Sequence, residues 1–257
     1  MTKEFNNGWA LILGGSSGLG LATAKKLAAH GMNICIVHRD RKSNLEVFKK
    51  EVEQMKRHNI EVRTFNKDAL QKETRDEVLA AFNKNEIKVL VHSVAKGSLK
   101  VMQAGADSLS KTDLDITLHA MGTSWYEWAR DIVATELYSE KSRFLAFTSE
   151  GNSKVWPGYA AVSAAKATLE SLMRSMAVEY ASLGITTNCL QAGATETPSF
   201  KMIPNSDKLA DAARKRNPFR RLTMPEDVAN AIYLLCKEEA NWINGTVLKV
   251  DGGESLR

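Results

Sequence analysis

The sequence has few cysteines and no long apolar run. Its 257 residues include three cysteines, Cys35, Cys189 and Cys236, whose spacing matches neither a metal-binding motif nor a disulfide framework. A small, odd number of scattered cysteines is typical of a reducing compartment. No run approaches the roughly 18 apolar residues of a membrane span, and the polar start MTKEFNNG lacks the core of a signal peptide. We therefore expect a cytoplasmic protein that is neither secreted nor inserted in a membrane.

A basic stripe interleaved with aromatic residues is also missing, as is any recognition-helix motif. The net charge is +5 and the isoelectric point is about 9.0, so the chain is modestly basic. An anionic cofactor or an acidic protein partner accounts for this excess as well as a nucleic acid would. We expect no nucleic-acid partner and no metal site.

Internal repeats, low-complexity tracts and linkers are absent, which indicates one domain over residues 1–257. Short apolar runs alternate with longer helical patterns. This alternation predicts an α/β fold, a Rossmann-type doubly wound domain whose seven-stranded parallel sheet is covered by helices on both faces. Strands are expected at Trp9–Leu13, Asn33–Val37, Glu61–Asn66, Val89–Val94, Arg143–Thr148, Ile185–Leu190 and Val247–Asp251. Helices are expected at Leu19–His30, Lys42–Arg57, Gln71–Asn83, Asp113–Leu137, Pro157–Leu183 and Pro225–Lys237.

The segment Pro198–Leu222 interrupts the alternation of strands and helices. It is long, polar and positively charged. An insertion of this length in a compact fold is usually a lid or a binding element, so we expect a substrate-binding lid at about residues 198–222.

A glycine-rich loop directly follows the first expected strand. It reads Gly14-Gly15-Ser16-Ser17-Gly18-Leu19-Gly20 and opens the first expected helix. Glycines there permit a tight turn and let the backbone approach a pyrophosphate at the helix N-terminus. The spacing differs from the G-x-G-x-x-G of many dinucleotide folds, but the position between a strand and a helix is that of a nucleotide-binding loop. The residues expected to bind the dinucleotide are Gly14, Ser16, Ser17, Gly18, Leu19 and Gly20.

Basic residues follow the second expected strand, in the run HRDRK. A guanidinium binds a ribose 2′-phosphate in a bidentate manner, so the expected cofactor is NADPH, with Arg39 as the first choice for the phosphate and Arg41 as the second. Asp40 complicates this interpretation, because a carboxylate there could bind the 2′-hydroxyl instead. Asp68, with Ala69 beside it, either accepts a hydrogen bond from the adenine amino group or is a plain surface aspartate.

Three residues in the stretch SEGNSKVWPGYAAVSAAK could act on a carbonyl group: Ser149, Tyr159 and Lys166. Tyr159 and Lys166 lie seven residues apart, so on one helix they would face the same way, roughly 10 Å apart along the axis. A bound sugar would fit between them. The ammonium would then hold the sugar and lower the pKa of the phenol, which would help it to donate a proton.

The glycine loop, this stretch and the closing run VDGG together resemble the short-chain dehydrogenase/reductase family, over essentially the whole chain. In most members the catalytic tyrosine precedes its lysine by four residues, and here that position is Val162. Tyr159 instead gives the spacing Y-x6-K, which resembles the enoyl-acyl carrier protein reductase branch. The run VHSVA at residues 91–95 resembles the same branch, and the C-terminal half is similar to its NADPH-dependent form III.

This resemblance implies further site residues. Tyr159 and Lys166 would be catalytic, with Ser149 as a third candidate that binds the nicotinamide side or the substrate, or only caps the strand end. His119 stands where many relatives carry an asparagine, and it either anchors a proton-relay water or simply packs. The cofactor is expected to contact Ser93, Val94, Ala95, Lys166, Gly193, Thr195 and Thr197.

The activity implied is NADPH-dependent reduction of the C2=C3 double bond of trans-2-enoyl thioesters, linked to acyl carrier protein or to CoA, in fatty acid synthesis. The lid would line an acyl channel and meet an acidic carrier through outward-facing cations. These cations are Lys201, Lys208, Arg214, Lys215, Arg216, Arg220 and Arg221. The resemblance also implies a homotetramer. The alternatives are a 3-oxoacyl or steroid-type carbonyl reductase and a non-catalytic NADPH-binding protein.

Overall fold

The computed structural model describes residues 4–5, 8–103, 105, 107–203 and 205–257. Seven strands form one sheet in the order β3-β2-β1-β4-β5-β6-β7, and every neighbouring pair is parallel. The expected α/β fold is thereby confirmed. The strands are β1 (Trp9–Leu13), β2 (Asn33–His38), β3 (Val62–Asn66), β4 (Ile87–His92), β5 (Tyr138–Thr148), β6 (Thr186–Ala192) and β7 (Val247–Val250).

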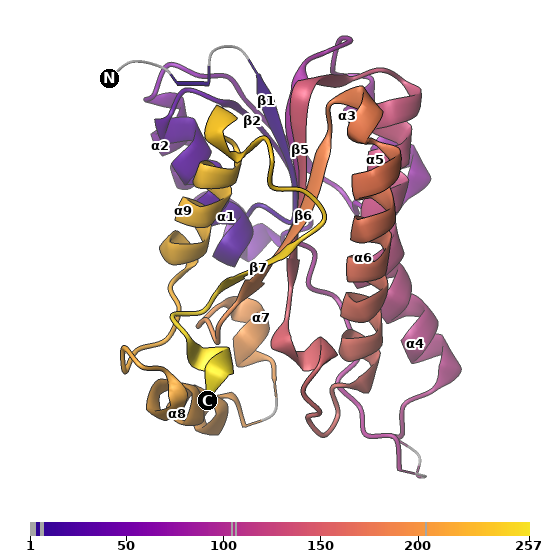
Figure 1. The fold of residues 1–257 in the computed structure, drawn as a ribbon, viewed down its shortest axis with the longest axis vertical. Coiled ribbons are helices and arrows are strands. Elements are labelled where there is room, and N and C mark those ends of the chain that lie inside the picture. The colour runs from indigo at the N-terminus through magenta and orange to yellow at the C-terminus, as the bar shows by residue number, and fades with distance from the viewer. Residues whose placement is uncertain (1–3, 6–7, 104, 106, 204) are drawn as a thin grey trace.

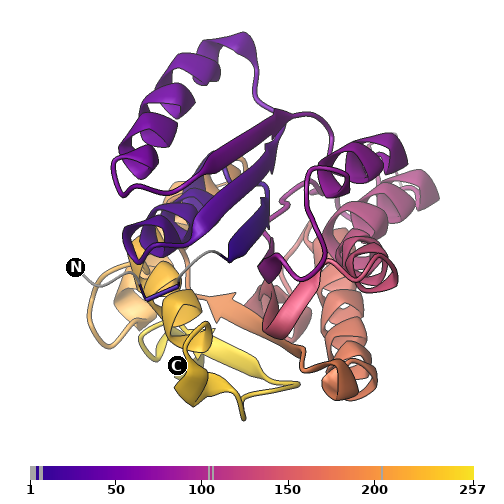
Figure 2. The same cartoon turned by 90° about the horizontal axis from the view of Figure 1, so that it is seen from above.

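Helices cover both faces of the sheet (Figures 1 and 2). One face carries α1 (Gly18–Ala29), α2 (Lys42–Lys56) and α9 (Pro225–Leu235). The other carries α3 (Lys72–Leu79), α4 (Lys111–Leu118), α5 (Ser124–Ala134) and α6 (Ala160–Glu179). All five residues of β1 are buried, because side chains on both faces of this central strand meet a helical layer.

The expected helix over 113–137 is interrupted in the structure. A capping box between Ser110 and Asp113 starts α4, and a π-helical turn at His119–Thr123 separates it from α5. A Cβ placed on Gly122 would lie 3.0 Å from the carbonyl oxygen of Ala165, so this turn packs tightly on α6. The expectation of one continuous α-helix was therefore wrong, because a π-helical turn divides it at the point where it packs on α6.

The helix expected at 157–183 is also shorter than its apolar pattern suggested. Helix α6 begins at Ala160, and Tyr159 is its N-cap residue, outside the first helical turn. Gly158 precedes it with a φ of 77°, a conformation that glycine adopts without strain. The phenol ring is therefore placed by the loop before α6, whereas Lys166 is placed by the helix itself.

The segment 198–222 is largely helical. It contains α7 (Pro198–Lys201), which Thr197 caps through its side chain, and α8 (Ser206–Arg216). In Figure 1 both helices lie beside the C-terminus, at the carboxyl end of β6. Within the described ranges, no helix is long and apolar enough to cross a membrane.

Candidate active site

The glycine loop lies where the strand order reverses direction, between β1 and β4. In open α/β sheets this switch point is where ligands bind, beyond the carboxyl ends of the strands. A Cβ on Gly14 would come within 2.5 Å of the carbonyl oxygen of Ser93, and one on Gly20 within 2.3 Å of the Gly14 oxygen. Two of the expected glycines are thus required by backbone contact alone.

The start of α1 offers backbone amides to an anion. Ser17 is its N-cap residue and makes no side-chain capping hydrogen bond. Gly18 has a φ of 53°, and a Cβ there would lie 3.1 Å from the Thr197 side chain. The glycine loop and the segment after β6 therefore face each other closely, and this cradle fits the pyrophosphate of a dinucleotide.

Charged residues gather at the far end of this cradle, after β2 and β3. Arg39 pairs with Asp68 at 2.8 Å, and Lys96 lies 3.9 Å from the same carboxylate. Asp40 turns to the buried His38, whose Nδ1 is 2.8 Å from its carboxylate. Among the residues that the structure describes, exposed Arg41 has no side-chain partner. The Asp40 carboxylate, which could bind a ribose 2′-hydroxyl, is thus already engaged by His38, and the Arg39 side chain remains largely exposed.

Tyr159 and Ser149 meet at the carboxyl end of β5. The Tyr159 hydroxyl donates to Ser149 Oγ at 3.3 Å, and the same oxygen accepts the amide N–H of Gly151 at 3.2 Å. Burial raises the pKa of Tyr159, and its hydrogen bond to Ser149 only partly opposes this shift. The phenol is therefore neutral at neutral pH and can donate a proton.

Gly151 makes room for the phenol ring. A Cβ on this residue would lie 2.4 Å from Cε1 of Tyr159 and 3.2 Å from Trp156. Trp156 packs edge-on against the same ring, with the centroids 5.2 Å apart. The ring is therefore held between a glycine and a tryptophan, a constraint that the sequence pattern did not reveal.

The Lys166 side chain, on α6, is buried. Its ammonium donates to the carbonyl oxygen of Phe147 at 2.7 Å, on β5. Desolvation by burial lowers the pKa of Lys166 to about 8. The amine thus lies at the end of β5, against the residue two positions before Ser149.

Val162 fills the position of the usual family tyrosine. It is buried in a small apolar cluster with Ala120, Met121 and Ala165, against which Tyr159 also packs. A Cβ on Gly97 would lie 2.9 Å from the Val162 side chain, so the loop after β4 closes over it. This side chain supports the site and has no group that could transfer a proton.

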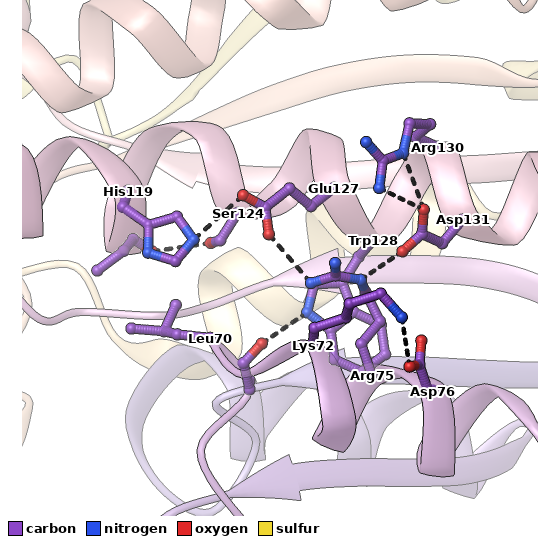
Figure 3. A network of polar contacts seen from close by, with 12 residues as sticks. Leu70, Lys72, Arg75, Asp76, His119, Ser124, Glu127, Trp128, Arg130 and Asp131 are labelled. Carbon is purple, nitrogen blue, oxygen red and sulfur yellow. Dashed lines mark hydrogen bonds and ion pairs between the residues drawn. The ribbon is translucent and has the colours of Figure 1, made fainter.

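His119 joins a polar network on the outer helices (Figure 3). Its Nε2 lies 3.1 Å from Glu127, which also pairs with the buried Arg75 at 3.0 Å. Arg75 holds Asp131 as well, so the network ties α3 to α5. Nearby, Trp128 donates to the carbonyl oxygen of Ala69, which braces the loop after β3.

The remaining expected residues take varied positions. Ser16 is half-buried, and Leu19 and Val94 each pack on one of the two main apolar clusters. Ala95 is exposed. Thr195 is buried and donates to the carbonyl oxygen of Gly193 at 2.8 Å.

One expectation for the lid was wrong. Arg216 does not face outward, because its guanidinium bridges Glu150 and Glu254. Both carboxylates border the site and were missed, since no local motif relates them. Lys201, Lys208, Lys215, Arg220 and Arg221 are exposed as expected, and Arg214 is half-buried.

Comparison with known families identifies the class of protein that this fold and site define. The family profile described as Enoyl-(Acyl carrier protein) reductase matches residues 14–255. The chain therefore belongs to the short-chain dehydrogenase/reductase family and is an NAD(P)-dependent oxidoreductase.

Curated relatives are similar over nearly the whole chain but differ in activity. A 1-cyclohexenylcarbonyl-CoA reductase of Streptomyces collinus is 28% identical over 96% of this chain and 86% of its own length. A probable 2,4-dienoyl-CoA reductase of Bacillus subtilis is 29% identical over 96% of each. A 3beta-hydroxysteroid dehydrogenase of Eggerthella lenta is 27% identical over 100% of this chain and 97% of its own.

Solved structures share the fold. A short-chain dehydrogenase from Burkholderia cenocepacia in complex with NADP superposes with a TM-score of 0.82, at 26% identity, covering 98% of this chain and 99% of its own. An actinorhodin polyketide ketoreductase with NADPH gives a TM-score of 0.84 at 20% identity, with 98% of both chains covered. The second likeness concerns the fold alone.

The contact between Gly151 and the phenol ring gives a first prediction. Gly151→Ala should lower kcat by about 10–100-fold with little change in cofactor affinity, because the methyl group displaces the Tyr159 ring. Turnover and NADPH titration measure the two effects. Gly105→Ala is the matched control, since a Cβ there meets nothing within 4 Å. Equal turnover in both variants would contradict the constraint.

The buried ammonium gives a second prediction, on pH. With the pKa of Lys166 at about 8, the amine is charged below that pH and neutral above it. Dinucleotide affinity should therefore fall as the pH rises through about 8, by up to about tenfold per unit, because the charged donor is lost. Fluorescence titration across this range measures it. Lys166→Met should bind weakly at every pH, and a flat profile in the unaltered protein refutes the assignment.

Proposed function

We propose that this protein reduces the C2=C3 double bond of trans-2-enoyl thioesters with NADPH, as an enoyl-acyl carrier protein reductase. One observation carries the proposal. Tyr159, the only tyrosine in the stretch 149–166, is hydrogen-bonded to Ser149, whereas buried Val162 fills the usual tyrosine position. Two relatives named as acyl-CoA double-bond reductases support the same substrate class.

Bound NADPH would supply the hydride that reduces C3 of the enoyl group. Negative charge then collects on the thioester oxygen, and the neutral Tyr159 hydroxyl stabilises it and donates its proton. Ser149 Oγ already accepts two hydrogen bonds, so its own proton is available to the same oxygen or to the nicotinamide side. The resulting enol would take a proton from solvent at C2 and return its hydroxyl proton to the Tyr159 phenolate, which restores both the thioester and the phenol.

Lys166 would act through its position and charge. The amine is already aligned by the Phe147 carbonyl, so it can hold the nicotinamide ribose without losing side-chain entropy at that moment. Its charge keeps the local potential positive and favours the anionic form of the substrate oxygen. Thr195 and Thr197 would hold the carboxamide and phosphate on the opposite side.

NADPH is favoured over NADH by the arrangement after β2. Arg39 is exposed and only one of its terminal nitrogens is bound to Asp68, so the guanidinium has donors left for a 2′-phosphate. Asp40, the competing carboxylate, is engaged by His38. The NADP-bound relative from Burkholderia cenocepacia agrees with this choice.

The substrate carrier would be acyl carrier protein or CoA. Exposed cations on α7 and α8, Lys201, Lys208 and Lys215, offer a basic surface to either acidic carrier. Apolar Phe200 and Ile203 of the same segment would line the acyl channel. We also propose a homotetramer packed through α4, α5 and α6, where exposed Ile116 and Val178 are apolar.

A second candidate is a carbonyl reductase of 3-oxoacyl or steroid substrates. The 3beta-hydroxysteroid dehydrogenase relative favours it, and the chemistry requires the same tyrosine and lysine. A non-catalytic NADPH-binding protein is a weaker alternative, because a half-buried phenol on a serine and a buried lysine are both retained.

Tyr159→Phe tests the proposed reaction. Turnover on crotonyl thioester should fall by about 10²–10³-fold with NADPH affinity nearly unchanged, because one donor to the developing oxyanion is lost. NADPH oxidation is followed with crotonyl and acetoacetyl thioesters side by side. A phenylalanine variant with full turnover excludes the role of Tyr159, and faster reduction of the acetoacetyl thioester establishes the carbonyl reductase.

Arg39→Gln tests the cofactor choice. The dissociation constant for NADPH should rise about tenfold or more while that for NADH stays the same, because only NADPH carries the 2′-phosphate. Fluorescence titration with each dinucleotide gives both constants. Arg41→Gln serves as the comparison and should have the smaller effect. An equal loss for both dinucleotides would show that Arg39 does not bind the phosphate.

A further inference from the structure

A compact ionic cluster joins three distant parts of the chain beside the site. Nη2 of Arg216, the last residue of α8, donates to Glu254 at 2.5 Å and also to Glu150. The Glu254 side chain is 2% exposed, that of Glu150 10% and that of Arg216 25%. Lys154 lies 3.0 Å from the second oxygen of Glu150, so the two carboxylates meet two cations.

Buried carboxylates are stable only when they are paired. Burial opposes the charge of Arg216, but the hydrogen bonds to Glu254 and Glu150 outweigh this effect and raise its pKa. The guanidinium is therefore a permanent cation between two anions, and no other side chain bridges this pair within the described residues.

Each member of the cluster belongs to a segment that borders the site. Glu150 directly follows Ser149. Glu254 accepts the N–H of Ala194 at 3.2 Å, in the segment that leads to Thr195 and Thr197. A Cβ on Gly193 would lie 2.8 Å from the Glu254 carboxylate, so that segment presses against the cluster.

Elsewhere the described part of the lid is held by more exposed ion pairs, Arg214 with Glu196 and Arg221 with Asp227, and by a small apolar cluster. The apolar cluster beneath it consists of Ala210, Ala213 and Leu222, with Ala194 and Phe200 against it. Three of these five side chains, those of Ala194, Ala210 and Ala213, are single methyl groups, so apolar burial stabilises α8 only weakly. Asn217, which follows Arg216, donates to the carbonyl oxygen of Asp251 at 2.9 Å.

We infer that Arg216 is a positioning residue that fixes α8 of the lid against both Glu150 and Glu254, and thereby sets the distance between the acyl channel and the loop of Ser149. The kinetic part of this inference rests on the proposed function. The ionic contact itself does not, because it is a property of the fold.

Hydrogen exchange of the full-length protein tests the contact directly. In Arg216→Met, the amides of 206–216 should exchange at least about tenfold faster than in the unaltered protein, because two buried carboxylates lose their shared cation. Arg214→Gln is the matched control on the same helix. Its partners, Glu196 and Asp211, form exposed pairs at 2.6 and 3.0 Å, which contribute little.

Glu254→Gln provides a second variant should Arg216→Met fail to fold. It retains an acceptor for Ala194 N–H but removes one charge, so exchange over 206–216 should rise by a smaller factor. The double variant Arg216→Met with Glu254→Gln should exchange more slowly than the product of the two single effects predicts, because the charge of Glu254 that lost its cation is also removed and Glu150 keeps its pair with Lys154.

Steady-state kinetics separate positioning from general loss of structure. Arg216→Met should raise the KM for crotonyl thioester about tenfold and lower kcat less, whereas partial unfolding would lower kcat with KM unchanged. Exchange over 206–216 that matches Arg214→Gln overturns the inference. If the unaltered protein reduces no enoyl thioester, the proposed function fails, and the exchange result still decides the role of Arg216.

Discussion

The hydrogen bond between Lys166 and the Phe147 carbonyl is the interaction on which the site depends. It joins α6 to the end of β5, and it is formed by an amine that burial makes costly to charge. Gly122 lets the π-helical turn press on the carbonyl of Ala165, the neighbour of this lysine, so the helix has little freedom to shift. Tyr159 and Ser149 therefore lie near an ammonium, that of Lys166, whose position is fixed by the packing of α6 on the sheet.

The fixed position of Lys166 restricts the positions from which a tyrosine can reach the site. The usual position, occupied by Val162, faces an apolar cluster that Gly97 closes from the other side. Tyr159 precedes the helix. Its position is therefore set by the turn at Gly158, which has a positive φ, and by the space that the missing side chain of Gly151 leaves for the ring. A tyrosine positioned by a loop is not bound to the helical spacing of the lysine, so it can lie seven residues before Lys166 and outside the helix.

Much of the fold was predictable because its strands are apolar throughout and its first loop is rich in glycine, and both signals are local. The π-helical turn and the late start of α6 were not, since each depends on packing between elements. The pairing of Arg216 with Glu150 and Glu254 spans 66 and 38 residues of sequence. Such a contact leaves no periodic trace, so basic residues of the lid were all expected to face solvent.

The two halves of the site are held by different kinds of interaction. Close backbone contacts shape the glycine loop, where Gly14 and Gly20 leave no room for a side chain. Side-chain charges at Arg216, Glu150 and Glu254 join the lid to the loop of Ser149, and single substitutions can change them. Relatives at 27–29% identity whose names include steroid and acyl-CoA substrates fit this division. A fold that fixes the dinucleotide through its backbone is free to change its substrate by altering the anchors of the lid.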